Sequence, residues 1–234
     1  MRDVVGELPI LVTFRTKNEG GVLELGEDEY LDLVATVVTN SLGDAVDIEL
    51  FHDEERVKDL VKQAHNYNVV VIMSNHDFEK VPAKDVIEFR LKKMANLGAD
   101  VPKLACMPHS ADDVLTLLSA TNDARKALST PIITMAMADL GKVSRIAGQV
   151  FGSCLSFGAV GKTSAPGQLS IEDLRNAENY LELHYDMTPE IRTLISGVIF
   201  MTKYTKEIKL AIYHEWVDDH RRGTYLSQKY GMGR

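Results

Sequence analysis

The stretch Val69-Val70-Val71-Ile72-Met73-Ser74-Asn75-His76-Asp77-Phe78 decides the fold that the sequence predicts. An apolar, mostly β-branched run is followed at once by polar and titratable residues. This pattern is typical of a buried parallel strand whose carboxyl end opens into a site. Alternation along a strand puts Val70, Ile72, Ser74 and His76 on one face. If that face looks into a barrel, His76 stands at the rim where β/α barrels carry their chemistry, as a candidate proton carrier. The alternative is a histidine that hydrogen-bonds within its own loop.

Strand-like runs alternate with helical stretches along the chain, which predicts βαβ units and a parallel sheet. We expect strands at 8–15, 45–51, 69–78, 101–107, 131–137 and 154–159, and helices at about 27–41, 53–67, 83–97, 110–126 and 140–149. A closed β/α barrel takes eight such units, and this chain supplies about six. The expected fold class is therefore α/β, of the (β/α)8 TIM-barrel family, incomplete and with a helical C-terminal extension.

The composition is that of a sizeable globular protein. The 234 residues are 45% hydrophobic and 26% charged, with a net charge of −8. The acidic balance argues against a general nucleic-acid or membrane-surface role, but a small anionic substrate needs only a few local arginines. Cys106 and Cys154 lie in apolar runs, and we expect buried free thiols in a reducing cytoplasm. We recognise neither a signal peptide nor an apolar stretch of the ~20 residues that span a membrane.

Lys103 interrupts the otherwise apolar run 101–107. Burial removes the charge of a lysine through desolvation, and the neutral amine can form a Schiff base with a ketone. A histidine on a neighbouring strand would then remove an adjacent proton and return it to a leaving hydroxyl. An imine-forming lyase needs this combination. The alternative is a lysine that reaches solvent from the start of the strand.

Other polar residues lie near expected strand ends, which converge on one face of a parallel barrel. Arg15, followed by a Gly-rich loop, is a candidate bidentate clamp for carboxylate or hydroxyl groups. Glu19 in that loop is a candidate to orient the strand-end histidine, or else a solvated carboxylate. Arg145 is a second candidate anion contact, or else a helix-surface arginine. Ser164 and Gln168, in a loop after the last strand, are candidate hydrogen-bond donors.

Several motifs resemble those of type I 3-dehydroquinate dehydratase, in the family's order and spacing, over about residues 8–175. They are Phe14-Arg15 with Glu19-Gly20-Gly21, Asp47-Ile48-Glu49-Leu50-Phe51, Met73-Ser74-Asn75-His76-Asp77-Phe78, Gly98-Ala99-Asp100-Val101-Pro102-Lys103, Ile133-Thr134-Met135-Ala136-Met137, Ser144-Arg145-Ile146-Ala147-Gly148, Phe157-Gly158-Ala159-Val160 and Ser164-Ala165-Pro166-Gly167-Gln168. The resemblance implies a cytoplasmic lyase of the shikimate pathway of aromatic amino acid biosynthesis. Such an enzyme dehydrates 3-dehydroquinate to 3-dehydroshikimate through a lysine Schiff base, with no metal and no organic cofactor, and homodimers occur in the family.

The resemblance also implies roles for individual residues. Lys103 matches the Schiff-base lysine, His76 the general acid–base, and Glu19 the carboxylate paired with that histidine. Arg145 matches the arginine that binds the substrate carboxylate. The remaining candidate substrate contacts, polar and apolar, are Arg15, Glu49, Met135, Met137, Phe157, Ser164 and Gln168.

Two stretches depart from the family pattern. The family has two βα units before the strand that ends in Arg15, whereas only residues 1–7 precede that strand here. We therefore expect a barrel domain at 1–185 without its first two units, with reduced stability and weakened binding. Residues 186–234 are expected to form a helical tail that resembles the start of a transposase helix-turn-helix. Three hypotheses stay open: an active dehydratase, an impaired or inactive remnant of it, and a DNA-binding fusion through the tail.

Overall fold

The strand predicted around His76 lies in the middle of a parallel sheet. The computed structural model describes residue 6 and residues 8–22, 24–161, 163, 165–180 and 200–201. Its main sheet has five strands in the order β1-β2-β3-β4-β5, which are Leu11–Thr13, Ala45–Glu49, Val70–Asp77, Val101–Cys106 and Ile133–Ala136. All neighbouring pairs are parallel. The expected α/β fold of the TIM-barrel type is therefore confirmed.

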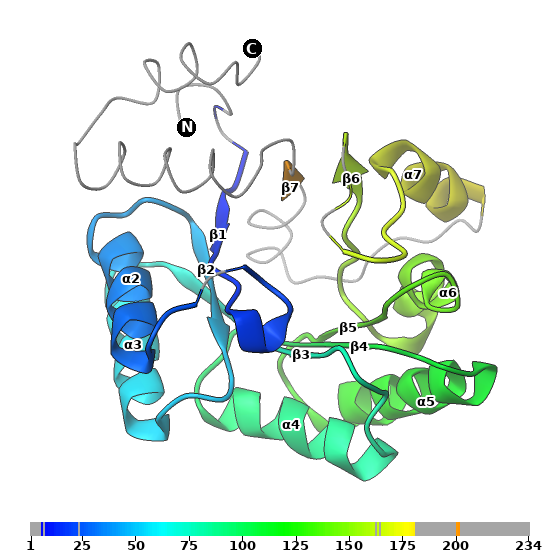
Figure 1. Ribbon diagram of the computed structural model, residues 1–234, viewed down its shortest axis with the longest axis horizontal. Coiled ribbons are helices and arrows are strands. Elements are labelled where there is room, and N and C mark those ends of the chain that lie inside the picture. The colour runs from blue at the N-terminus through cyan, green and yellow to red at the C-terminus, as the bar shows by residue number, and fades with distance from the viewer. Residues whose placement is uncertain are drawn as a thin grey trace.

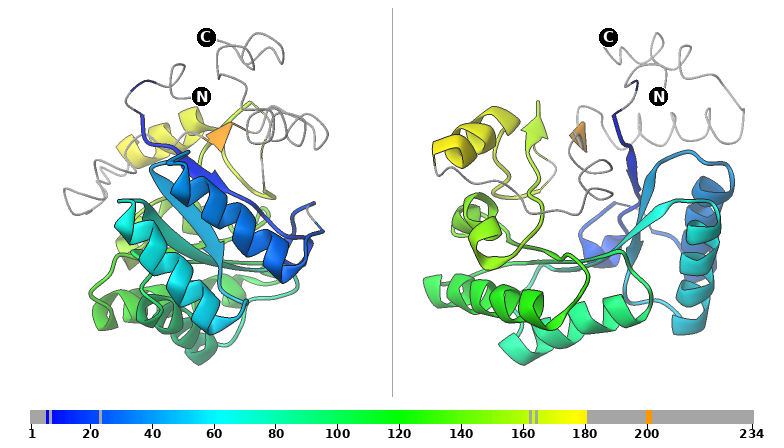
Figure 2. Two further views of the ribbon diagram at one scale, coloured as in Figure 1. Left: turned by 90° about the vertical axis from the view of Figure 1, so that its left-hand side faces the viewer. Right: turned by 180° about the vertical axis from the view of Figure 1, so that it is seen from behind.

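Helices connect successive strands and lie along the outer side of the sheet. The long ones are α2 (Glu27–Thr39), α3 (Glu54–Asn66), α4 (Lys84–Asn96) and α5 (Ala111–Ala127). Figure 1 shows them outside an arc of strands, and the view from behind in Figure 2 shows the same arrangement. The far end of the arc carries α6 (Lys142–Ile146), the 3-10 helix η2 (Gly148–Phe151), β6 (Ala159–Val160) and α7 (Ile171–Tyr180).

Side-chain caps begin two of these helices. Ser110 Oγ accepts a hydrogen bond from Asp113 N at 3.1 Å, and Asp113 Oδ2 accepts one from Ser110 N at 3.0 Å. This is the capping box that the spacing of the two residues suggests for α5. Asp53 Oδ1 accepts from Arg56 N at 3.0 Å and caps α3 in the same way.

The two faces of the sheet have different surroundings. Outward side chains such as Ile48 and Leu104 are fully buried against the helices in the main core. Inward side chains such as Ile72 and Ile133 form a smaller apolar cluster. Strand alternation therefore separates the residues that pack against helices from those that face the barrel interior.

The sixth expected strand, 154–159, is wrong in extent. Strand β6 begins only at Ala159, and it pairs in parallel with β7 (Phe200–Met201) rather than with β5. The run still returns to the main sheet, because Cys154 N donates to Ile132 O at 2.8 Å. Residues 155–158 form no strand, and at Gly158 the backbone lies so close to α7 that a Cβ would be only 2.9 Å from Ile171 Cα. The run therefore ends against a helix rather than as a strand beside β5.

The boundary expected between a domain at 1–185 and a helical tail at 186–234 falls outside the described residues. Of that tail only Phe200 and Met201 are described, and they form a strand rather than a helix. For the other residues of the tail, the helical structure and the transposase likeness stay predictions. Cys106 and Cys154 are buried and free, as expected. Among the described helices, none has the length and hydropathy of a membrane span.

The packing of α4 predicts unequal costs for two substitutions on that helix. Leu91 is fully buried, whereas Phe89 is 64% exposed. We expect Leu91→Ala to lower the free energy of unfolding by about 2–5 kcal/mol, because it removes buried methyl groups and leaves a cavity. The matched control, Phe89→Ala, should change it by less than about 1 kcal/mol. Urea denaturation followed by circular dichroism measures both, and equal losses would contradict the described orientation of α4.

Candidate active site

Polar side chains gather on the inward face of three adjacent strands, toward their carboxyl ends. Alternation puts Asp47 and Glu49 of β2, Ser74 and His76 of β3, and Lys103 of β4 on this face. The strand register aligns Glu49 with Ser74, and Ser74 with Lys103. These five side chains from three strands therefore share one region inside the arc.

Arg15, two residues beyond β1, links these strands through its guanidinium. Its Nη2 donates to Asp47 Oδ2 at 2.8 Å. Its Nη1 donates to Ser74 Oγ at 2.9 Å, to Glu49 Oε1 at 3.0 Å and to Glu19 Oε2 at 3.3 Å. Burial opposes the charged form, but the three carboxylates hold the pKa of Arg15 above its ordinary value. These donors, which the sequence analysis assigned to substrate, bind protein groups in this structure.

Lys103 Nζ donates to Asp47 Oδ2 at 3.1 Å and lies 4.9 Å from the centroid of the Phe157 ring. Burial lowers the pKa of Lys103, and the positive charge of Arg15 lowers it further, while Asp47 opposes both. Burial by itself would raise the pKa of Asp47, but Arg15 and Lys103 hold it below its usual range. Asp47 therefore stays ionised between two cations, and the lysine releases its proton more readily than an exposed one.

Asp47 is a site residue that the sequence analysis did not single out, although it stands in a quoted motif. The available signal was the one that drew attention to Lys103, a charged residue at an inward position of an apolar strand. Asp47 is 1% exposed, and it also accepts a hydrogen bond from Ser74 Oγ at 2.5 Å.

Glu19 and His76 form a close pair. His76 Nδ1 lies 2.9 Å from Glu19 Oε2, and the same oxygen accepts from His76 N at 3.1 Å. Burial and the nearby Glu49 raise the pKa of Glu19 to about 8. Burial, Lys103 and Arg15 hold the pKa of His76 well below its ordinary value, so the imidazole is neutral at pH 7. The structure thus brings together the two residues that the sequence analysis paired, and Glu19 is not a solvated loop carboxylate.

The loop after Arg15 explains how Glu19 reaches this position. Residues Lys17–Glu19 form the 3-10 turn η1, and Gly21 N donates back to Thr16 O at 2.8 Å. A Cβ on Gly21 would lie 1.9 Å from the carbonyl oxygen of Arg15. Only glycine allows the backbone to fold back this closely, which turns Glu19 toward β3.

Glu49 is buried and held by the same loop. Its Oε1 accepts from Thr16 N at 2.8 Å, and its Oε2 accepts from Thr16 Oγ1 at 2.6 Å. Burial alone would raise the pKa of Glu49, but the nearby His52 imidazole, 3.8 Å away, the hydrogen bonds from Thr16 and the charge of Arg15 lower it. Like Arg15, Glu49 is engaged by protein groups, and its expected contact with substrate stays a prediction.

The apolar candidates line the other side of the interior. Met135, Met137 and Phe157 are buried together in the inner cluster. Of the three, Phe157 lies next to Lys103, because its ring is the one near Nζ. Of the two polar candidates in the loop beyond β6, Gln168 is buried and Ser164 lies outside the described residues.

Arg145 is a buried cation rather than a helix-surface arginine. It is 2% exposed, on α6. Its Nη1 lies 3.4 Å from Met135 Sδ, and its Nε has no hydrogen-bond partner within the described part of the chain. Burial lowers the pKa of Arg145 to about 10. Such a guanidinium suits an anionic ligand, whose oxygens would satisfy its donors.

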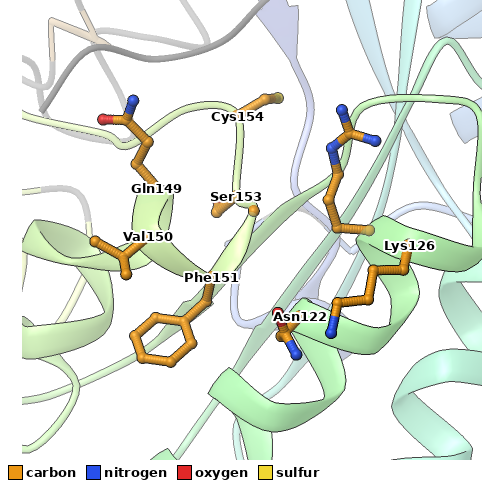
Figure 3. Close-up of a pocket in the computed structure, with 9 residues that line it drawn as sticks. Asn122, Lys126, Gln149, Val150, Phe151, Ser153 and Cys154 are labelled. Carbon is orange, nitrogen blue, oxygen red and sulfur yellow. The ribbon is translucent and has the colours of Figure 1, made fainter.

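Two recesses differ in their relation to this region. One of about 580 Å³ borders Glu19 and His76 and is also walled by Arg90, Phe51 and Phe78. The other, of about 270 Å³, lies between α5 and the η2 segment, where Figure 3 shows Gln149, Val150, Phe151, Ser153 and Cys154 on one side and Asn122 and Lys126 on the other. Ser153 pairs with Ile132, just before β5, so this second recess lies at the amino ends of the strands, away from the candidate site.

Within the described ranges, no cluster of histidine, cysteine and carboxylate side chains is placed to hold a metal ion.

Several known proteins that are similar to this chain carry the name 3-dehydroquinate dehydratase. A family model for type I 3-dehydroquinase matches residues 1–184. The 3-dehydroquinate dehydratase of Lactiplantibacillus plantarum is 55% identical over 184 residues, which are 79% of this chain and 73% of that protein. The enzyme of the same name from Listeria monocytogenes serotype 4b (strain F2365) is 50% identical over 185 residues, with the same coverage of 79% and 73%.

A solved structure agrees with these relatives. The type I 3-dehydroquinate dehydratase from Clostridium difficile, crystallised with covalent modified comenic acid, matches with a TM-score of 0.74 and 45% identity. The match covers 77% of this chain and 71% of that one.

The raised pKa of Glu19 predicts how stability depends on pH. From the ordinary glutamate value of 4.5 up to about 8, the unfolded chain loses a proton that the folded chain retains. The unfolded state then binds fewer protons, so Glu19 makes the free energy of unfolding fall as pH rises through this window. Because Glu19→Gln removes this effect, the free energy of unfolding of the variant relative to the unaltered chain should rise by about 2–5 kcal/mol from pH 5 to pH 8.

Urea denaturation at several pH values measures this difference. Glu24→Gln is the matched control, because the Glu24 side chain in the same loop is 81% exposed. We expect the control to follow the unaltered chain at each pH. Parallel stability profiles for Glu19→Gln and the unaltered chain would contradict the raised pKa.

Proposed function

The chain belongs to the type I 3-dehydroquinase family, and from this we propose that it dehydrates 3-dehydroquinate to 3-dehydroshikimate, a step of the shikimate pathway. It is a lyase of the hydro-lyase class, like the relatives that it matches. One observation carries the mechanism that we propose. Lys103 pairs in register with Ser74, and His76 stands two positions further on the same inward face. A nucleophilic amine and a proton carrier therefore lie on neighbouring strands above one apolar cluster.

Lys103 is the proposed nucleophile. Burial lowers the pKa of Lys103, so a larger fraction of this side chain is a neutral amine than in an exposed lysine at the same pH. Nζ attacks the ketone carbon of the substrate, and loss of the carbonyl oxygen as water leaves a carbon–nitrogen double bond. Asp47, 3.1 Å from Nζ, pairs with the ammonium before the reaction and balances the charge of the protonated imine after it.

His76 is the proposed proton carrier. The protonated imine withdraws electrons from the adjacent carbon of the substrate. Neutral His76 then removes a proton from that carbon, and an enamine forms. The electron pair then returns, the bond to the hydroxyl on the following carbon breaks, and His76 donates its proton so that the hydroxyl leaves as water. Hydrolysis of the imine releases the unsaturated ketone and regenerates Lys103. Glu19 orients the ring by its contact with Nδ1, and it is the ionised form of Glu19 that leaves a lone pair on Nε2 for the substrate.

Arg145 is the proposed contact for the substrate carboxylate. It is a buried guanidinium whose Nε has no partner within the described residues, and an anion would satisfy it. The family resemblance assigns Ser164, Gln168, Arg15 and Glu49 to the polar groups of the substrate. It assigns Met135, Met137 and Phe157 to packing around the ring.

A catalytically impaired form of the same enzyme is the second candidate. The observation that favours it is the position of β1 at one edge of a five-stranded sheet, because an open edge leaves part of a barrel interior accessible to water. A homodimer and a cytoplasmic location remain proposals from the family resemblance. DNA binding through 186–234 rests on residues that are almost entirely outside the described ones.

Borohydride reduction tests the proposed imine. Incubation of the chain with 3-dehydroquinate and borohydride should add one substrate-derived group to Lys103, as read by intact mass and peptide mapping. His76→Ala should keep this adduct but lower kcat by about 10²–10⁴-fold, because the imine can form without the proton carrier. An adduct that persists in Lys103→Ala would contradict the assignment. An adduct on Lys103 without turnover would favour the impaired form.

Arg145→Met tests the proposed carboxylate contact. It keeps much of the buried volume and removes the cation, so KM for 3-dehydroquinate should rise by about 10-fold or more, the loss of one charge-assisted contact. Arg125→Met is the matched control, because it removes an exposed arginine that lines the second recess. An unchanged KM in Arg145→Met would exclude the contact.

A further inference from the structure

A chain of hydrogen bonds runs from helix α4 to the Glu19–His76 pair. Arg90 Nη1 donates to Asn75 Oδ1 at 2.8 Å. Asn75 Nδ2 in turn donates to Glu19 Oε1 at 3.1 Å. Glu19 Oε2 is the oxygen that lies 2.9 Å from His76 Nδ1. Asn75 is 3% exposed, so its amide has little access to water that could replace either partner.

Arg90 determines which way the Asn75 amide points. A guanidinium can only donate hydrogen bonds, so the amide atom that faces it must be the oxygen. The NH₂ group of Asn75 is then forced toward Glu19, where it can only donate. A donor favours the ionised carboxylate, whereas an amide oxygen in that place would favour the protonated acid.

The ionisation of Glu19 in turn decides which nitrogen of His76 carries the proton. An ionised Glu19 accepts from Nδ1–H and leaves Nε2 with a free lone pair, ready to act as a base. A protonated Glu19 donates to Nδ1, so the proton of the neutral ring is on Nε2. The second state holds one more proton than the first, and the pair therefore changes between them as the pH changes.

We propose that Asn75 and Arg90 are positioning residues that set the proton arrangement of the Glu19–His76 pair, with Arg90 fixing the Asn75 amide in the orientation that favours the basic Nε2 of His76. Neither residue was singled out in the sequence, because Asn75 points away from the interior face and Arg90 lies on a helix. The positioning role affects catalysis only through the proton transfer by His76, and in this respect the inference rests on the proposed function.

The charged groups around Glu19 and Arg90 agree with this role. Glu49 and Asp47 of β2 raise the pKa of Glu19, whereas Arg15 and the Asn75 amide lower it. With a pKa of about 8, Glu19 is close enough to neutrality for one hydrogen bond to change its state.

Contacts on the other side keep Arg90 in place. Its Nη1 lies 3.5 Å from Asp77 Oδ2, and its guanidinium carbon lies 5.4 Å from the centroid of the Phe51 ring. With its guanidinium held by these contacts, Arg90 donates through Nη1 to the side-chain oxygen of Asn75 at 2.8 Å.

The test is a ¹⁵N NMR titration of the His76 ring nitrogens in the full-length chain, without substrate. The chemical shifts of Nδ1 and Nε2 distinguish the two tautomers of His76. The pH midpoint of the change from one to the other gives the apparent pKa of the Glu19–His76 pair. In Arg90→Met the amide is free to reverse, and we expect the midpoint to move up by about one pH unit, the effect of one hydrogen bond to a charged group. Arg90→Lys, which also can only donate, should restore a midpoint near that of the unaltered chain.

Lys92→Met is the matched control, because Lys92 is exposed on the same helix and the substitution removes the same charge. It should leave the midpoint unchanged. If Arg90→Met does not fold, Arg90→Gln serves instead, because its amide can accept as well as donate and should also raise the midpoint. An unchanged midpoint in the folded variant, or an equal change in Lys92→Met, would overturn the inference.

The outcome is separable from that of the proposed function. The titration needs no turnover, whereas the imine is tested by the Lys103 adduct. A shifted midpoint without an adduct would support the positioning role and reject the imine. An adduct with an unshifted midpoint would do the reverse.

Discussion

The site depends on the guanidinium of Arg15, which is bonded to three carboxylates from two different segments. Glu19, Asp47 and Glu49 are all buried, and without a cation among them each would favour its protonated form. Arg15 bonds all three at 2.8–3.3 Å and also bonds Ser74, so one side chain joins β1, β2, β3 and the η1 turn. Removal of one partner from such a buried group typically costs about 3–5 kcal/mol, because it leaves a charge uncompensated. The loop with Gly21 is needed for the same reason, since it turns Glu19 toward this cation.

The carboxylates that contact Arg15 do so at different distances and have different neighbours, so their pKa values differ. Asp47 lies between Arg15 and Lys103 and keeps a low pKa. Glu19 has the longest bond to Arg15, 3.3 Å, and it faces Glu49, so its pKa rises to about 8. Titratable groups whose environments push their pKa values apart are typical of acid–base sites. The same cation also lowers the pKa values of Lys103 and His76, so one buried charge favours both a neutral amine and a neutral imidazole.

The sequence predicts the parts of this structure that follow from periodicity. Strands β2 to β5 and helices α2 to α5 match the expected runs to within a few residues, because alternation and helical spacing reflect burial directly. Lys103 and His76 stand out because each interrupts or ends an apolar strand. Asn75 and Arg90 could not be found in this way, since they are 15 positions apart and their contact forms only in the folded structure. The extent of the sixth strand was not predictable, because local composition contains neither the close approach of Gly158 to α7 nor the pairing of β6 with β7.

The central claim is that burial and the positive charge of Arg15 together hold the pKa of Lys103 below its ordinary value inside the barrel, against the opposing effect of Asp47. The most direct measurement is a ¹³C NMR titration of the Lys103 ε-methylene in the substrate-free chain, with the signal assigned by its loss in Lys103→Met. The account predicts a midpoint below the ordinary lysine value of 10.5, and a still lower one in Asp47→Asn, where the opposing carboxylate is neutralised. A midpoint at or above the ordinary value would mean that Asp47 outweighs burial and Arg15. In that case burial would not favour the neutral amine, and the proposed nucleophile would need another source of activation.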